Sequence, residues 1–225
     1  MQQTSLNLIA IGIFSITLCS LLGPLLHIPP AIPAIATFGI LGLATLDTLT
    51  WQGKGVNLLL DSLSGASAGY RDRIIRHEAG HFLVAYLLGI PVTSYVLSAW
   101  EAFKQGKPGQ GGVSFKDIES NSLTPLLIQR YSTLWMAGIA AETLVYGNAE
   151  GGAEDREKLR GVLSSLKRSP TECLQQERFC ILQAQTLIKE NWAAYEALVT
   201  AMEQRLPVSE CDQIIQEHQY PLKVD

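Results

Sequence analysis

Hydrophobic positions fill the first fifty residues almost without a break. The run from Leu6 to Ile28 is interrupted only by Asn7, scattered hydroxyl groups and His27, and Pro29-Pro30 follows it. As a helix, this run would be about 34 Å long, enough to cross a bilayer core of about 30 Å. Proline disfavours continuation of a helix, so we expect the first helix to end before the proline pair.

A second apolar run extends from Ala31 to Leu49, with Asp47 near its end. Together the two runs predict an N-terminal transmembrane helix hairpin, and we assign residues 1–52 to a membrane anchor. Two alternatives remain open. One is a single spanning helix followed by an interfacial segment. The other is a cleaved signal peptide, although the chain lacks the basic residues that usually begin one.

After residue 52 the hydrophobic positions become periodic, which predicts a mainly α fold with a small β element. We expect a linker at 53–70, a folded helical domain at 71–219 and a tail at 220–225. Helices are predicted at 71–88, 124–146, 153–166, from 169 to about 205 and at 209–218, and strands at 92–100 and 112–115. Residues 101–112 are expected to form a loop because they contain four glycines and a proline.

Several local signals mark where these helices begin and end. Gly89 and Gly147 follow apolar periodic segments and are expected to stop the helices there. The segment from Ser169 to Glu172, with the sequence Ser-Pro-Thr-Glu, predicts a capping box with proline at the first helical position.

Charge refines this organisation. Charged residues make up only 17% of the chain, mean hydropathy is +0.16, and no Lys or Arg precedes Lys54. If both apolar helices span a membrane, the basic residues after them place the remainder on the cytoplasmic side, or on its organellar equivalent. The net charge of −4, without a basic patch interleaved with aromatics, argues against nucleic acid as a partner. No Cys-x-x-Cys pair occurs, which makes a cysteine zinc site improbable.

The sequence His-Glu-Ala-Gly-His, residues 77–81, carries the candidate chemistry. On a helix, His77 and His81 project from one face, where two neutral imidazoles can bind one Zn²⁺. Glu78 lies beside the first ligand and can act as the general base of a zinc peptidase. A catalytic zinc site needs a third protein ligand. From residue chemistry, Glu142, Glu154 and Asp155 all remain candidates, and a buried Glu142 could instead orient a ligand histidine.

This stretch also looks like the first motif of the site-2 intramembrane proteases. The residues around it do not fit a membrane site, because Arg71, Asp72, Arg73 and Arg76 lie just before His77. The apolar run that follows the motif would span only about 16 Å as a helix, too short to cross a bilayer. We therefore expect the histidines to lie in a soluble domain.

A second stretch, LWMAGIAAETLVYGNAEGGAEDREKL at 134–159, adds a family resemblance. Together with the histidine motif it resembles the peptidase domain of the FtsH family of membrane-anchored zinc metalloproteases. That resemblance implies Asp155 as the third zinc ligand. The chain departs from the family in having Ile139 where an arginine is usual. It also lacks the Gly-x-x-x-x-Gly-Lys-Ser/Thr phosphate-binding motif of the family's ATPase. Stand-alone relatives of this kind suggest, by resemblance, a cyanobacterial or plastid membrane.

These observations predict a membrane-anchored, ATP-independent zinc metalloendopeptidase that acts on unfolded or loosely structured polypeptides, membrane proteins among them. The strand predicted at 92–100 could pair with an extended substrate. The alternative is a non-catalytic membrane scaffold or adaptor subunit of a larger protease complex. Membrane lipid and a polypeptide are the expected partners, ATP is not, and the chain could form homo-oligomers or join an FtsH-type complex.

Overall fold

The computed structural model describes residues 2–23, 25, 27–51, 68–104, 112–116 and 124–219. Contacts along the backbone divide the chain into two compact units. One comprises Met1–Ser67 with Ser98–Gln110, and the other comprises Ala68–Leu97 with Gly111–Asp225. Most of the predicted linker at 53–70, and the tail at 220–225, lie outside the described residues.

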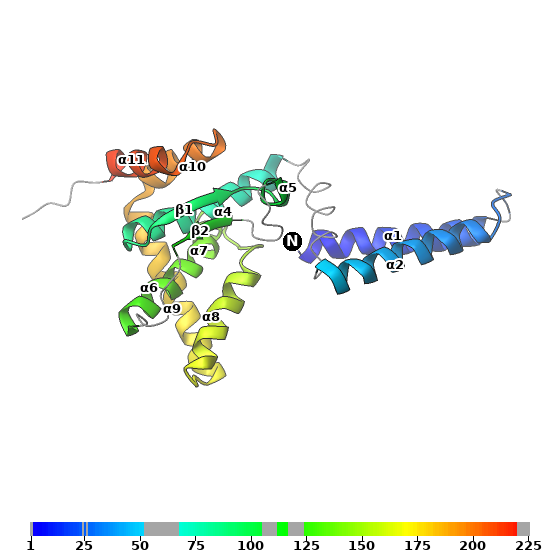
Figure 1. Ribbon diagram of the computed structural model, residues 1–225, viewed down its shortest axis with the longest axis horizontal. Coiled ribbons are helices and arrows are strands. Elements are labelled where there is room, and N and C mark those ends of the chain that lie inside the picture. Colours follow the sequence, from blue (N-terminus) through cyan, green and yellow to red (C-terminus); the bar gives the residue numbers. More distant parts are fainter. Residues whose placement is uncertain are drawn as a thin grey trace, which may run out of the picture. The chain divides into compact units, whose positions relative to one another are not determined.

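The first unit contains α1 (Gln2–Leu22), α2 (Ala31–Trp51) and α5 (Ala99–Lys104), and α1 and α2 lie side by side (Figure 1). The helix α1 ends six residues earlier than the apolar run predicted. At Gly23 an added Cβ would lie 2.7 Å from the carbonyl oxygen of Cys19, so a side chain there would collide with the preceding turn. The backbone instead turns, and the N–H of Ile28 donates to the carbonyl oxygen of Gly23 at 2.8 Å.

In the part of the chain that the structure describes, no helix combines the length and the apolar character needed to cross a membrane. The two transmembrane spans predicted from the sequence are therefore not supported by the structure.

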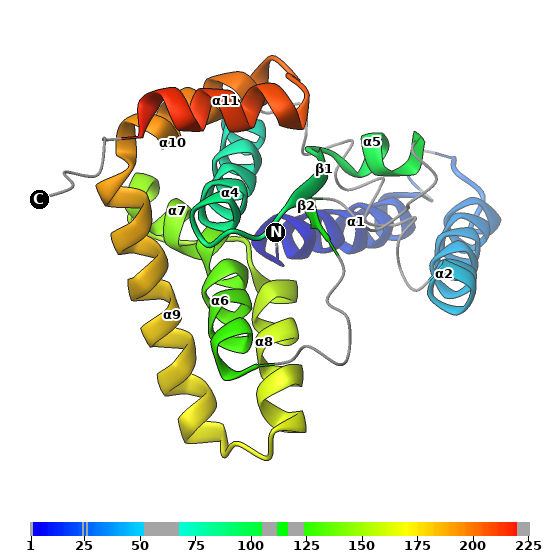
Figure 2. The ribbon, with the colours of Figure 1, turned by 60° about the vertical axis from the view of Figure 1, so that its left-hand side comes forward.

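The second unit is built around α4 (Ala68–Leu87), which carries the histidine motif. It packs against α7 (Ala137–Tyr146) and α10 (Trp192–Glu203), and α11 (Val208–His218) lies beside α10 (Figure 2). An added Cβ at Gly80 would lie 2.7 Å from both the carbonyl oxygen of Ala137 and the Cβ of Ala141. The small residues on both helices thus allow a close approach that larger side chains would prevent. This approach places Gly80, within the histidine motif, against α7.

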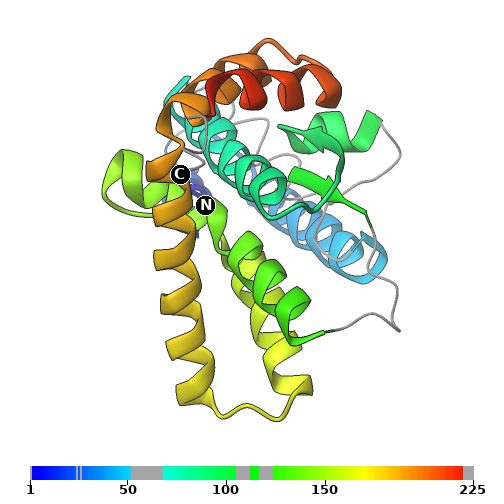
Figure 3. The same ribbon diagram turned by 90° about the vertical axis from the view of Figure 1, so that its left-hand side faces the viewer.

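Two further helices, α8 (Ala153–Ser165) and α9 (Pro170–Glu190), form a hairpin (Figure 3). The capping box predicted before α9 is confirmed, since the Ser169 side chain accepts from the Glu172 N–H and the Glu172 carboxylate accepts from the Ser169 N–H. Both predicted glycine stops are also confirmed, with φ of 69° at Gly89 and 78° at Gly147.

The prediction of a single helix at 124–146 was wrong. The chain forms α6 (Pro125–Trp135) and α7, separated at Met136. Thr124 caps α6 by accepting from the N–H of Leu127. Hydrophobic periodicity alone could not locate the break, because both pieces continue to bury apolar residues. The break matters for the site, since the last carbonyl groups of a helix need partners outside it.

The β element is a two-stranded antiparallel sheet of β1 (Val92–Val96) and β2 (Gly112–Phe115). The second strand is confirmed where it was predicted. The first is shorter than predicted, because residues from Ala99 onward form α5 rather than extending the strand. Because α5 extends to Lys104, the first residues of the loop predicted at 101–112 are helical instead. The pairing register of the two strands shifts between Val92 and Ser94.

Candidate metal centre

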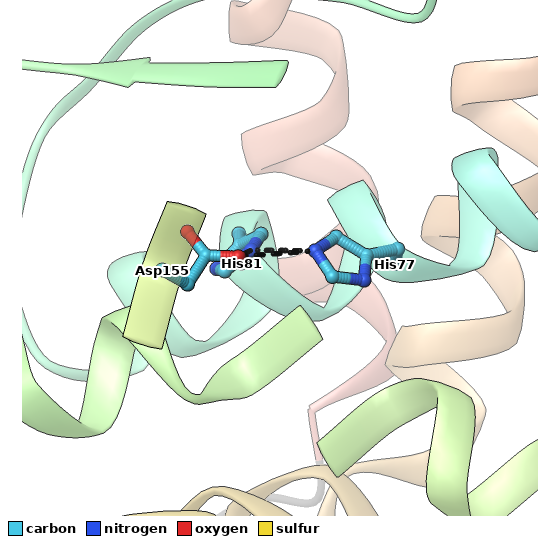
Figure 4. Close-up of side chains that lie close together, drawn as sticks. All are labelled: His77, His81 and Asp155. Carbon is cyan, nitrogen blue, oxygen red and sulfur yellow. Dashed lines mark hydrogen bonds and ion pairs between the residues drawn. The ribbon is translucent and has the colours of Figure 1, made fainter. Parts of the chain in front are cut away.

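His77, His81 and Asp155 meet in the interior of the second unit (Figure 4). The two histidines come from consecutive turns of α4, and the aspartate comes from the first turn of α8. Their exposed fractions are 8%, 6% and 9%, so all three are buried. The structure thus brings together residues 78 positions apart, and it does so with the three ligand candidates that motif and resemblance predicted.

The atoms that face one another are separated by nearly equal distances. The two Nε2 atoms lie 3.1 Å apart, and Oδ2 of Asp155 lies 3.3 Å from Nε2 of His77 and 3.4 Å from Nε2 of His81. In a tetrahedral site with bonds of about 2.0–2.1 Å, ligand atoms lie roughly 3.3–3.4 Å apart. The three atoms are therefore spaced as the ligands of one metal ion would be.

The other ring nitrogen of each histidine is held by an acceptor. Nδ1 of His81 donates to the carbonyl oxygen of Leu134 at 2.8 Å, and Nδ1 of His77 donates to Oε1 of Glu142 at 2.7 Å. A carbonyl oxygen can only accept, so Nδ1 of His81 carries a hydrogen, and Nε2 is the nitrogen of this ring that belongs to the candidate ligand group. Such partners orient ligand histidines and fix their tautomers in metalloproteins.

Glu142 accepts the hydrogen bond from His77 together with several others. Its two oxygens accept from His77, from Arg73 at 2.9 Å and from the backbone N–H groups of Glu150 and Gly151 at 2.9 and 3.1 Å. Burial on its own raises the pKa of Glu142, but these hydrogen bonds outweigh it and lower the pKa to about 2. With four donors around a carboxylate that is 1% exposed, Glu142 supports His77 and is not part of the candidate ligand group.

The ligand candidates themselves show strong electrostatic coupling. Burial on its own lowers the pKa of His77, yet hydrogen bonds to Asp155 and Glu142 raise it to about 10. Burial on its own raises the pKa of Asp155, but the charge of His81 and the hydrogen bonds with both rings hold it far below its usual value. Without a metal, therefore, these pKa shifts favour a protonated His77 beside an ionised Asp155. A cation can replace that proton.

Glycines provide the space for this arrangement. A Cβ at Gly138 would overlap the imidazole of His77, and a Cβ at Gly151 would lie 2.6 Å from Oε1 of Glu142. Gly152, with φ of 84°, precedes α8, and a Cβ there would overlap Ile139. The Gly151-Gly152 turn therefore lets the chain pass close to α7 just before Asp155. The isoleucine that departs from the family pattern packs against this turn.

Glu78 lies outside the candidate ligand group. It is half-buried, and its Oε2 accepts from the backbone N–H of Val113 on β2 at 3.0 Å. Glu154, the neighbour of Asp155, is exposed to solvent, as expected for adjacent residues on a helix. Of the three carboxylates considered as third ligand, only Asp155 faces the two Nε2 atoms.

Two contributors to the site were not identified from the sequence. Arg73 binds Glu142 and also lies over the ring of Tyr146, with its guanidinium carbon 4.3 Å from the ring centroid. Its position four residues before His77, on the same helix face, was the signal that could have found it. The carbonyl oxygen of Leu134 left no such signal, because any residue provides one.

No protein-family model matches this chain, and none of the curated proteins compared with it matches either.

Proposed function

We propose that this protein is a zinc metalloendopeptidase in which His77, His81 and Asp155 bind the ion and Glu78 is the general base. The observation that carries the proposal is the convergence of two Nε2 atoms and one carboxylate oxygen at 3.1 to 3.4 Å, with both Nδ1 atoms held by acceptors. Two histidines and a carboxylate form a set typical of catalytic zinc, which keeps a fourth position for water or substrate.

Zinc bound here would polarise a peptide carbonyl and make a coordinated water more acidic. The chain's own residues would then move the protons. Glu78 takes a proton from the attacking water as its oxygen bonds to the carbonyl carbon. It later delivers that proton to the amine nitrogen as the C–N bond breaks. Glu142 and the carbonyl oxygen of Leu134 keep the two rings aligned throughout.

The substrate we propose is an extended or loosely folded polypeptide. The chain contains no phosphate-binding motif with which to couple ATP hydrolysis to unfolding. A two-stranded sheet beside the metal centre offers backbone groups to an incoming strand. Because a folded substrate offers no extended segment, the rate of cleavage should depend on how often the substrate unfolds.

We further propose that α1 and α2 anchor the chain to a membrane, with the metal centre on the cytoplasmic or stromal side. In support, these helices expose many large apolar side chains: Ile11, Ile13, Phe14, Leu18, Leu21, Leu22, Ile32, Ile35, Phe38, Ile40, Leu41, Leu43, Leu46 and Leu49. The hydroxyls of Thr17, Ser20, Thr37 and Thr45 each donate to the carbonyl four residues earlier, so these donors are satisfied within the helix.

The second candidate is a membrane scaffold or adaptor that binds metal without cleaving peptides, alone, as a homo-oligomer or within an FtsH-type complex. The absence of an ATPase motif favours it, whereas Glu78, which is not among the candidate ligands, favours the enzyme. A scaffold or adaptor of this kind would bind partner proteins without cleaving them.

The deciding experiment is purification of the full chain in detergent, metal analysis, and digestion of an unfolded protein such as casein with and without a zinc chelator. The proposal expects about one zinc per chain and cleavage that chelator abolishes and zinc restores. Glu78→Gln is the matched control, because it should keep the zinc and lose the cleavage. Zinc binding without cleavage by the unmodified chain would favour the scaffold.

A further inference from the structure

The carboxylate of Glu78 is attached to the sheet by one backbone hydrogen bond. The N–H of Val113 donates to its Oε2 at 3.0 Å. Among the described residues no other hydrogen bond to this carboxylate is found. Oε2 is therefore held by β2, and none of the hydrogen bonds among the described residues involves Oε1.

The Val113 N–H can make this bond because it points away from β1. Val113 lies opposite Tyr95 in the sheet, and the N–H of Lys116 donates to the carbonyl oxygen of Pro91 on the β1 side. Backbone N–H groups along a strand point alternately to its two sides. Residues 114 and 116 thus face β1, and Val113 faces the opposite edge, where α4 presents Glu78.

Gly112 provides the space in which this carboxylate lies. Its φ of 101° is a conformation that residues with a side chain rarely adopt. The three atoms nearest to an added Cβ all belong to Glu78: Oε2 at 2.9 Å, Oε1 at 3.2 Å and Cδ at 3.3 Å. A side chain at this position would displace the carboxylate.

We propose that the start of β2 positions Glu78 for catalysis, with the Val113 N–H fixing one oxygen and Gly112 leaving room for the carboxylate. This inference rests on the proposed role of Glu78 as general base. A glutamate side chain has several rotatable bonds, and a base must be held at hydrogen-bond distance from the proton it takes. Gly112 and Val113 therefore act through Glu78 as positioning residues and need not touch the substrate.

The hydrogen bond can be tested in the full chain without metal or activity. We expect amide hydrogen exchange at Val113 to become about tenfold faster or more in Glu78→Ala, since hydrogen bonds to charged groups are among the stronger ones. The Lys116 amide, bonded to Pro91 in the same strand, is the internal control and should exchange at an unchanged rate. Equal exchange at Val113 with and without the carboxylate would overturn the proposal.

The catalytic consequence is tested by comparing Val113→Pro with Val113→Ala. Both variants remove the branched valine side chain, but only proline also removes the N–H. Because this N–H bonds to Glu78 and not to β1, proline removes no hydrogen bond between the two strands. We expect kcat for a peptide to be about ten- to a hundredfold lower in the proline variant than in the alanine variant, with similar KM and zinc content. Equal kcat in the two variants would refute the positioning role.

Gly112→Ala should lower kcat in the same way and retain zinc, and its near-ultraviolet circular dichroism reports whether it folds. A wild-type chain that cleaves no peptide would refute the proposed hydrolysis instead. The exchange result at Val113 would still decide whether β2 holds Glu78.

Discussion

Replacing Asp155 with alanine should remove one of the three metal-binding atoms and leave the two histidines in place. Zinc binding to sites with four protein ligands is worth about 10–16 kcal/mol at neutral pH, or about 2.5–4 kcal/mol for each ligand. Loss of one ligand should thus weaken zinc binding by roughly two to three orders of magnitude. The buried carboxylate lies 3.3 and 3.4 Å from the two rings, so no solvent-exposed group can readily replace it.

The assay is metal analysis of the purified chain, followed by competition with a chromophoric zinc chelator to obtain the dissociation constant. Glu154→Ala is the matched control, because it removes a neighbouring carboxylate that is exposed and should bind zinc as the wild type does. Circular dichroism of both variants without metal verifies that each is folded. Full zinc occupancy in Asp155→Ala would refute the three-ligand centre.

Four further predictions concern the metal centre and its orientation at a membrane. Glu78→Gln should keep the zinc content within about twofold of the wild type and abolish peptide cleavage, as measured by metal analysis and casein digestion; surviving cleavage would exclude the general-base role. Glu142→Ala should weaken zinc binding about 10- to 100-fold in chelator competition without abolishing it, because Glu142 supports His77 and does not itself bind the metal. An unchanged zinc affinity would contradict this role. Zinc affinity should rise about tenfold per pH unit between pH 6 and 8, because the ion must displace the proton that keeps His77 charged below its pKa of about 10. Chelator competition across this range measures the affinity, and an affinity independent of pH would contradict the prediction. In sealed vesicles, added protease should digest the metal-centre unit only from the cytoplasmic or stromal side, and digestion from the opposite side alone would contradict the proposed orientation.

The stability of the metal-free protein should also depend on pH through two of these groups. The pKa of His77 is raised from 6.5 to about 10, so its contribution is complete below pH 6.5 and is lost as pH rises toward 10. The pKa of Glu142 is lowered from 4.5 to about 2, so its contribution is complete above pH 4.5 and is lost as pH falls toward 2. For these groups the melting temperature in chelator should be highest between pH 4.5 and 6.5. A melting temperature that rises between pH 6.5 and 10 would contradict the assignment.

The amino-acid sequence by itself determined the features that depend on neighbouring residues. The spacing of His77 and His81 places both rings on one helix face, whatever the surrounding fold. The capping box at Ser169 and the glycine stop at Gly147 formed as predicted, because their hydrogen bonds and backbone angles involve only a few adjacent residues. The mainly helical fold with a small sheet followed from periodicity in the same way.

Residue chemistry alone could not choose the third ligand. Glu142, Glu154 and Asp155 are all carboxylates near glycines or helix ends, and the resemblance to a known family was needed to prefer Asp155. In the structure the choice depends on where α8 begins relative to α4, which the turn at Gly151-Gly152 and the packing of Ile139 determine. These are contacts between segments far apart in sequence.

Tertiary structure likewise decided the surroundings of the two rings. The break at Met136 ends α6 so that the carbonyl oxygen of Leu134 can accept from His81, and no residue type signals that role. The Val113 N–H reaches Glu78 because β2 pairs with β1 in one register and leaves the other edge toward α4. A backbone group has the same chemistry at every position in the chain, so only the packing of α4 against its neighbours determines which ones support the site.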